Sequence, residues 1–198
     1  MDNQNYGSAS LKTNISRRTL LAGIVAAAAT PTLAAAGAPT TSPRPKARPS
    51  TRRFWMKSIH TGEEIDRVYF SDGSYNPGAL RDIRHFLRDW RTGDVYDMDL
   101  GGIDLWAETH RLLGANRPFQ LISGYRSPKT NGMLQKNSNG VAKKSYHMRG
   151  MAADLRLEGR SLRQIARAAS KAGAGGIGVY PGSGFVHVDT GPVRRWEG

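Results

Sequence analysis

Alternation of apolar and polar residues predicts six β-strands in this chain. Segments of this kind bury every second side chain and are bounded by Gly, Pro, Asn, Asp or Ser. The first two expected strands flank the short polar segment 61–64, so we expect them to form a hairpin. The six expected strands cover residues 54–60, 65–70, 119–123, 152–157, 177–180 and 185–190.

Apolar residues at helical spacing predict four helices. Asn76 followed by Pro77 is typical of a helix start, and this first helix is expected to run to about Trp90. Ser161 and Gln164 form a capping box that begins the last helix. The second helix is expected over 101–113 and a short third one over 129–136. His110 shares the buried stripe of the second helix, and we interpret it as a hydrogen-bonded core histidine rather than a metal ligand.

The order of these elements predicts the fold class. A hairpin, two helices, a strand, a loop, a strand, a helix and two further strands follow one another. This order is typical of an α+β domain. We therefore expect helices packed on one central antiparallel sheet, formed by residues 54–198.

The N-terminal region reads as an export signal and a tether. Residues 14–36 combine a basic pair, an apolar run of about ten residues and small residues suited to cleavage after Ala34 or Ala36. The run is too short and too rich in alanine to span a bilayer. Arg17 and Arg18 lie in Ser-Arg-Arg-Thr-Leu-Leu, which looks like a twin-arginine signal. We expect a twin-arginine signal peptide (1–36), a Pro/Arg-rich linker (37–53), a periplasmic protein and no integral membrane segment after cleavage.

Charge and composition narrow the class of partner. The formal net charge is +13, which favours an anionic partner. Nucleic acid is the usual partner of such a charge, but the export signal and the lack of a recognised binding motif argue against it. The chain has no cysteine, so disulfides are excluded.

One His/Asp pair is the start of a candidate metal site. His147 precedes Asp154, and Asp154 lies in an expected strand. Side chains alternate along a strand, so His187 and Asp189 share one face of the last strand. If the two strands are neighbours, Asp154 meets His187, and Gly150 gives the loop the freedom to bring His147 over them. Two imidazoles and a carboxylate suit zinc, with a fourth position left for water.

Hydrolysis at such a site needs two further groups. Arg126 lies on a loop that leaves a strand and keeps its charge, so it is our candidate for stabilising an oxyanion; the alternative is a surface or structural arginine. Asp189 is our candidate general base, because it shares the face of His187. Its alternative role is to orient His187 through the other ring nitrogen.

Three ordered motifs also carry a family resemblance. They are Ser123-Gly124-Tyr125-Arg126-Ser127-Pro128, Ser145-x-His147-x-x-Gly150-x-Ala152-x-Asp154 and Phe185-Val186-His187-Val188-Asp189-Thr190-Gly191. Together they resemble the D-Ala-D-Ala metallopeptidase family, which shares its zinc site with the hedgehog domain. The match is closest to the YcbK-like (MepK-type) murein endopeptidases and covers essentially all of residues 54–198.

The resemblance implies a function for these residues. It implies zinc held by His147, Asp154 and His187, a hedgehog/D-Ala-D-Ala-peptidase-like fold, and hydrolysis of peptide cross-links between peptidoglycan stem peptides, including those between two diaminopimelate residues. Arg126 stands where relatives have an arginine that polarises or anchors the substrate. Many relatives carry a general-base glutamate three residues before the last histidine, where this chain has Gly184. This glycine motivates one alternative, an inactive metal-containing wall-binding protein, and a murein carboxypeptidase is a second alternative.

Stem peptides carry free carboxylates, so a basic cleft would hold them. Lys144, next to the metal motif, is a candidate substrate-binding residue, and its alternative is a solvated charge. Tyr125 and Tyr180 are candidates for stacking on the substrate or donating to it, and either can instead be a packing residue.

Overall fold

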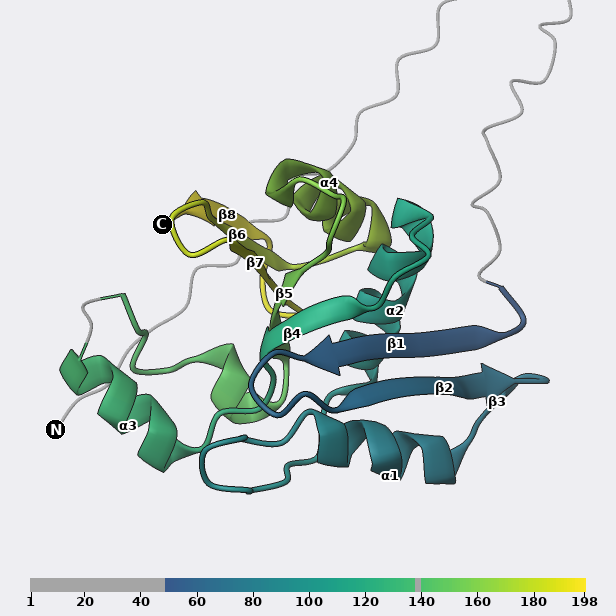
Figure 1. Cartoon of the computed structure of the whole chain (residues 1–198), viewed down its shortest axis with the longest axis horizontal. Helices are drawn as coiled ribbons and strands as arrows, with labels where there is room; N and C mark the ends of the chain where they lie inside the picture. Colours follow the sequence, from purple (N-terminus) through teal and green to yellow (C-terminus); the bar gives the residue numbers. More distant parts are fainter. Residues whose placement is uncertain (1–48, 138–139) are drawn as a thin grey trace, which may run out of the picture. The chain divides into compact units, whose positions relative to one another are not determined.

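The computed structural model describes residues 49–198, with the exception of residues 138 and 139. The predicted signal peptide and most of the predicted linker lie outside the described residues. In chain order the elements are β1 (Arg52–Ser58), β2 (Glu64–Ser71), β3 (Ser74–Tyr75), α1 (Pro77–Phe86), α2 (Leu100–Leu113), β4 (Phe119–Ser123), α3 (Pro128–Asn137), the 3₁₀ helix η1 (Tyr146–Arg149), β5 (Ala152–Arg156), α4 (Leu162–Ala172), β6 (Gly176–Tyr180), β7 (Phe185–Asp189) and β8 (Arg194–Glu197) (Figure 1).

The described strands form one mixed sheet in the order β3-β2-β1-β4-β5-β7-β6-β8. The α+β class is confirmed, but the expectation of an antiparallel sheet is wrong for two pairings. β1 and β4 run parallel, because the chain between them passes through β2, β3, α1 and α2 before it returns. β6 and β8 are also parallel. β8 is absent from the predicted strands, since its sequence, Arg-Arg-Trp-Glu, has a single apolar residue.

The strand order brings together the two strands that the metal hypothesis needs. β5 pairs with β7 in antiparallel fashion, and Asp154 lies directly opposite His187. The β6–β7 register places Gly178 opposite His187 on the other side. Alternation then separates the two faces, because Leu155, Val186 and Val188 belong to the hydrophobic core while Asp154 and His187 point away from it.

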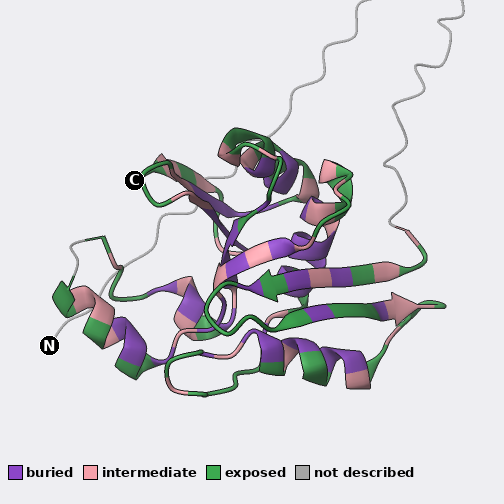
Figure 2. Cartoon of the chain, viewed as in Figure 1, coloured by how far each residue is buried: buried purple, intermediate pink, exposed green. Residues whose placement is uncertain are grey.

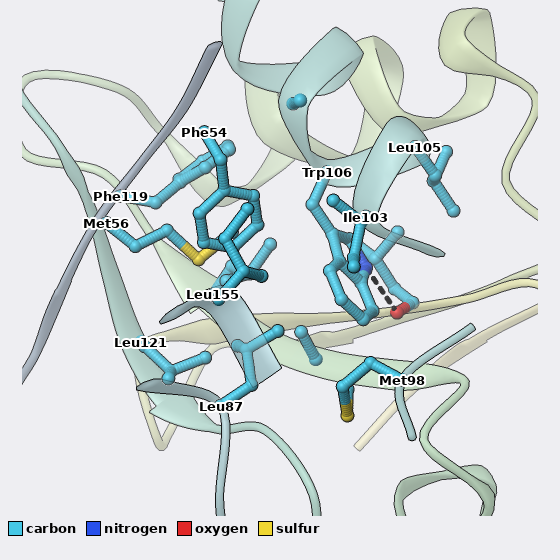
Figure 3. Packing of buried hydrophobic residues seen from close by; sticks show 14 of the residues in the cluster. Phe54, Met56, Leu87, Met98, Ile103, Leu105, Trp106, Phe119, Leu121 and Leu155 are labelled. Atoms are coloured by element: carbon cyan, nitrogen blue, oxygen red, sulfur yellow. Dashed lines mark hydrogen bonds between the residues drawn. The ribbon is translucent and has the colours of Figure 1, made fainter. Parts of the chain in front are cut away.

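The core lies between one face of the sheet and the helices α1, α2 and α4. α2 packs against α4 and β1, and α4 packs against β6 and β7. Buried residues gather along these elements and the central strands (Figure 2). Trp106 of α2 is fully buried, and its indole N–H donates to the Val188 carbonyl of β7 at 3.2 Å (Figure 3). These helices cover one face of the sheet, and Asp154 and His187 lie on the opposite face.

The helix starts agree with the sequence, whereas one helix end does not. The side chain of Asn76 accepts from the backbone N–H of Ala79, and Ser161 and Gln164 make the expected capping box. The first helix was expected to reach Trp90 but ends at Phe86. It stops there because the Leu87 carbonyl, beyond its end, accepts the backbone N–H of Tyr125 at 2.8 Å.

Two smaller features complete the comparison with the sequence. The first strand begins at Arg52 rather than at residue 54, because Arg52 pairs with Asp104 at 2.6 Å and lies over the ring of Phe70. His110 is half-buried and donates through Nε2 to the Arg117 carbonyl at 2.7 Å, as expected of a hydrogen-bonded histidine. Among the described residues, no helix is both long and apolar enough to cross a membrane.

Candidate metal centre

The stretch before β5 turns His147 towards the sheet. Ser145 caps the short helix η1, and its hydroxyl accepts the backbone N–H of His147 at 3.3 Å. Gly150 ends the helix at φ 65°. A Cβ at this glycine would lie 2.9 Å from the ring of Tyr96, so both the positive φ and the close packing require glycine. Sequence reasoning expected a loop here and missed the helical turn.

Three side-chain atoms converge where η1 meets β5 and β7. His147 Nε2 lies 3.2 Å from Asp154 Oδ1 and 3.2 Å from His187 Nδ1, and the remaining edge, His187 Nδ1 to Asp154 Oδ1, measures 2.9 Å. All three residues are buried. Ligands about 2.0–2.2 Å from a tetrahedral zinc stand roughly 3.3–3.6 Å apart. The triangle is slightly smaller than one face of that tetrahedron, so the donor set fits zinc after a small expansion.

Each histidine has a second ring nitrogen that points away from the three converging atoms, and its hydrogen bond shows which nitrogen carries the proton. His147 Nδ1 donates to the Gly124 carbonyl at 2.7 Å, and His187 Nε2 donates to Asp189 Oδ2 at 2.8 Å. In the neutral rings the inner nitrogens therefore carry lone pairs directed at each other and at Asp154. Three buried acceptors at this distance repel one another unless a cation, either a metal ion or a proton, lies among them.

The electrostatics of the metal-free trio show the same need for positive charge. Burial opposes charge on His187, but hydrogen bonds and charges from Asp154 and Asp189 outweigh it and raise the pKa of His187 to about 9. Burial lowers the pKa of His147. Burial alone would raise the pKa of Asp154, yet His147 and His187 hold that pKa well below its usual range. A proton on His187 therefore occupies the place of a metal cation.

This proton gives a testable pH dependence. The pKa of His187 is 6.5 in an unfolded chain and about 9 in the metal-free fold, so its stabilisation is complete below pH 6.5 and lost as pH rises through 9. We expect the melting temperature of chelator-treated protein to fall across this window. Zinc-loaded protein should not show this loss, because the metal replaces the proton. Thermal denaturation from pH 6 to 9.5, with chelator or with zinc, measures the difference. A flat profile for the metal-free protein would contradict the inferred protonation.

Asp189 lies on the outer side of the His187 ring and is completely buried. Its Oδ1 accepts the backbone N–H groups of Gly176 and Gly191 at 3.1 and 2.8 Å. Its Oδ2 accepts from His187 and from Arg194 Nη2, the latter at 2.5 Å. Both carboxylate oxygens of Asp189 thus accept hydrogen bonds on the side of the His187 ring that is turned away from Asp154. This geometry favours the alternative role, orientation of His187, over a general base that must reach a water in the cleft.

The loop after β4 brings Arg126 beside the same centre. Its Nη2 lies 3.8 Å from Asp154 Oδ2, and Nη1 contacts Asn131 Oδ1 at 3.4 Å. Its Nε is buried and has no hydrogen-bond partner among the described residues. Burial lowers the pKa of Arg126, with Asp154 opposing the shift, but a guanidinium remains charged at neutral pH. A cationic donor therefore lies next to the three converging atoms.

Sequence reasoning missed the residue that anchors this loop. Asp89, almost fully buried, accepts from the backbone N–H and the hydroxyl of Ser127 at 2.9 and 2.7 Å. Gly124 packs against α1's end so closely that a Cβ would lie 2.6 Å from the Leu87 carbonyl oxygen. Asp89 lies near the end of the predicted helix but beyond the observed α1, and it has no motif around it, so the sequence held no signal for this contact.

A cleft of about 840 Å³ opens over the three converging residues. Of the predicted substrate-binding residues, Lys144 and Tyr180 line it, whereas Tyr125 is not among the lining residues and stacks on Tyr96 with ring centroids 4.7 Å apart. Asp154 supplies the only carboxylate among the described lining residues. The cationic and aromatic groups that line it are Arg126, Lys144, Arg194, Arg195, Tyr146, Tyr180, Phe185 and Trp196.

The Gly184 position has a structural explanation. Gly184 has φ 70° in the turn between β6 and β7, and its N–H donates to the Tyr180 carbonyl at 2.8 Å. A glutamate at this position would be strained in the left-handed region. The turn that brings His187 into the sheet therefore favours glycine where many relatives of the resembled family carry their base.

Known proteins that are similar to this chain match it over most of its length. A family model described as "Peptidoglycan L,D-endopeptidase MepK" matches residues 46–196. The chain is 44% identical over 186 residues to the peptidoglycan L,D-endopeptidase MepK of Escherichia coli (strain K12), covering 93% of this chain and 99% of that protein. It is 38% identical over 151 residues to a probable peptidoglycan L,D-endopeptidase MepK of Haemophilus influenzae, covering 76% of this chain and 81% of that one.

Proposed function

Because the chain belongs to the peptidoglycan L,D-endopeptidase MepK family, we propose that it is an exported, zinc-dependent endopeptidase that cleaves L,D cross-links between peptidoglycan stem peptides. The observation that carries the proposal is the convergence of His147, Asp154 and His187 at the floor of a basic cleft. The finer fold assignment, hedgehog/D-Ala-D-Ala-peptidase-like, belongs to the same proposal.

The chain's own residues provide the zinc site. His147 Nε2, His187 Nδ1 and one carboxylate oxygen of Asp154 would hold the metal. Bound zinc would polarise a peptide carbonyl and acidify a water at the open position. The hydrogen bonds of the outer ring nitrogens fix the orientation of both imidazoles, with His147 Nε2 and His187 Nδ1 facing inward. The site is thus arranged before the metal arrives, which lowers the cost of binding.

Arg126 is the residue that we propose for charge stabilisation. Its guanidinium lines the cleft beside Asp154, and its buried Nε has no hydrogen-bond partner in the part of the chain that the structure describes. A carbonyl oxygen that gains negative charge would accept from such a donor more strongly in the transition state than in the ground state. The contacts of Asp89 and Gly124 hold the loop that carries it.

Tyr180 is a substrate-binding residue in this proposal. Its hydroxyl accepts the indole N–H of Trp196 at 2.9 Å, and its ring stacks on Phe185. Because that hydrogen bond uses a lone pair of the oxygen, the phenolic proton stays free to be donated into the cleft. Lys144 is exposed at the rim, where it would attract the free carboxylates of the stem peptides.

Proton removal from the attacking water does not need Asp189 in this scheme. Asp189 is committed to His187 and Arg194, and Gly184 offers no side chain. Among the described cleft residues the one carboxylate left is the metal ligand Asp154, so the scheme relies on zinc to acidify the water and names no separate base. We assign Asp189 instead to the orientation of His187.

A digest of purified sacculi tests the proposed function. We expect zinc-loaded protein to convert L,D-cross-linked dimers to monomers, chelator to stop this reaction, and added zinc to restore it. Parallel digests of dimers with L,D and D,D cross-links determine which bond is cut. Release of a terminal amino acid from intact dimers would support a carboxypeptidase instead. Sacculus binding with bound zinc and unchanged dimers would identify an inactive wall-binding protein.

A further inference from the structure

The C-terminal strand reaches the metal centre across a neighbouring strand. β8 runs beside β6, with Arg194 opposite Gly176 and Trp196 opposite Gly178. A Cβ at Gly176 would lie 2.3 Å from Asp189 Oδ2, and one at Gly178 would lie 2.3 Å from the Trp196 indole. These two glycines leave the face of β6 bare. Side chains from β8 therefore cross over β6 to meet side chains from β7.

The side chain of Arg194 crosses over Gly176 and binds Asp189. Its Nη2 donates to Asp189 Oδ2 at 2.5 Å, and Nη1 approaches Oδ1 at 3.4 Å. The same Oδ2 accepts the Nε2–H of His187. Asp189 is completely buried, whereas the side chain of Arg194 is 38% exposed. A buried carboxylate needs a compensating charge, and a neutral, metal-bound His187 does not supply one.

Aromatic contacts restrict the guanidinium itself. Its central carbon lies 4.7 Å from the ring centre of Tyr146 and 5.2 Å from that of Trp196. Trp196 in turn packs on the His187 ring, with centroids 5.3 Å apart. The guanidinium therefore contacts two aromatic rings while it faces Asp189. A guanidinium that stacks on aromatic rings and presents a rigid fork of donors is well suited to hold a carboxylate in one direction.

We propose that Arg194 is a positioning residue for the metal site. Acting through Asp189, it fixes the His187 ring so that Nδ1 faces Asp154 and His147. The inference rests on the zinc site of the proposed function, and it adds a residue from β8 to the three ligands. Without the guanidinium, Asp189 Oδ2 keeps only its contact with His187 and the buried carboxylate loses its cationic partner, so the His187 ring is held less firmly.

The test compares zinc affinity in three variants. Arg194→Met keeps the aliphatic stem but removes the charge, and we expect zinc affinity to fall about 10–100-fold, as for loss of other outer contacts of ligating histidines. Arg194→Lys keeps a charge with poorer geometry and should lie between Met and wild type. Arg52→Met is the matched control, because it breaks a comparably buried pair, Arg52–Asp104, outside the cleft. It should lower stability and leave zinc affinity unchanged.

Competition with a chromophoric chelator measures the affinity, and ¹⁵N shifts of the imidazole nitrogens report whether His187 keeps its proton on Nε2. Saturating zinc should restore much of the activity of Arg194→Met, since the ligands themselves remain. Zinc affinity of Arg194→Met within threefold of wild type, or an equal loss in Arg52→Met, would overturn the inference and leave the proposed function standing. If Arg194→Met does not fold, Arg194→Lys provides the same comparison. Wild-type protein that binds no zinc would overturn both.

Discussion

Replacement of His147 with alanine is expected to abolish cross-link cleavage and zinc binding together. His147 is buried, and its Nε2 is 3.2 Å from each of the other two converging atoms. Two remaining ligands do not make the three-residue set that catalytic zinc requires. Loss of a direct ligand should cost more than the roughly 100-fold upper range for losing an outer contact. Metal content after dialysis and the rate of dimer cleavage measure the two effects.

A second histidine provides the control for this variant. His85 lies exposed on α1 and is not part of the converging group, so His85→Ala should bind zinc and cleave dimers as the wild type does. His147→Ala with wild-type zinc content would show that the three residues are not the metal site. Full zinc loss with retained cleavage would show that catalysis does not depend on the metal.

Arg126→Met is expected to lower the cleavage rate about 10²–10³-fold while zinc remains bound, because the variant removes one charged donor from the reacting centre. The way the loss divides between kcat and KM identifies the role. A fall in kcat with unchanged KM indicates stabilisation of the transition state, whereas a rise in KM indicates anchoring of the substrate. Steady-state kinetics on a purified L,D-cross-linked dimer separate the two.

The control for Arg126 lies on the strand of Asp154. Arg156 is exposed, donates to Gln120 and is not among the residues that line the cleft, so Arg156→Met should keep the wild-type rate. Equal rate losses in the two variants would assign the effect to general loss of positive charge. Loss of zinc from Arg126→Met would instead indicate that Arg126 supports the ligands.

Much of the fold was predictable because short apolar segments bounded by turn residues mark the central strands. Each of the six predicted strands overlaps an observed one, and the helix caps at Asn76 and Ser161 are in place. The parallel direction of β1 and β4 could not be predicted from the sequence, since it depends on the path of the long connection between them. β8 escaped prediction because its stability comes from pairing with β6 and from Trp196 crossing Gly178, which no local pattern reveals.

The family resemblance is confirmed by the match to the MepK model and to its relatives, as is the assignment to metallopeptidases acting on peptidoglycan. The proximity of the motif residues could be predicted from the sequence, because alternation along a strand determines the faces on which Asp154 and His187 lie. What the sequence could not provide is the surrounding support. Asp89 and Arg194 make contacts between segments that are distant in the sequence, and the hydrogen bonds of Asp189 favour orientation of His187 over the role of general base.

The position of β8 has a consequence for solubility. In the described sheet β8 forms one edge, and the two-residue β3 forms the other. Exposed edges are templates for pairing with other chains, and short strands rich in charge discourage it. Three of the four residues of β8 are charged, namely Arg194, Arg195 and Glu197, whereas the neighbouring strand β6 contains Ile177 and Val179. Loss of β8 would thus uncover an apolar strand edge and make the protein prone to aggregate.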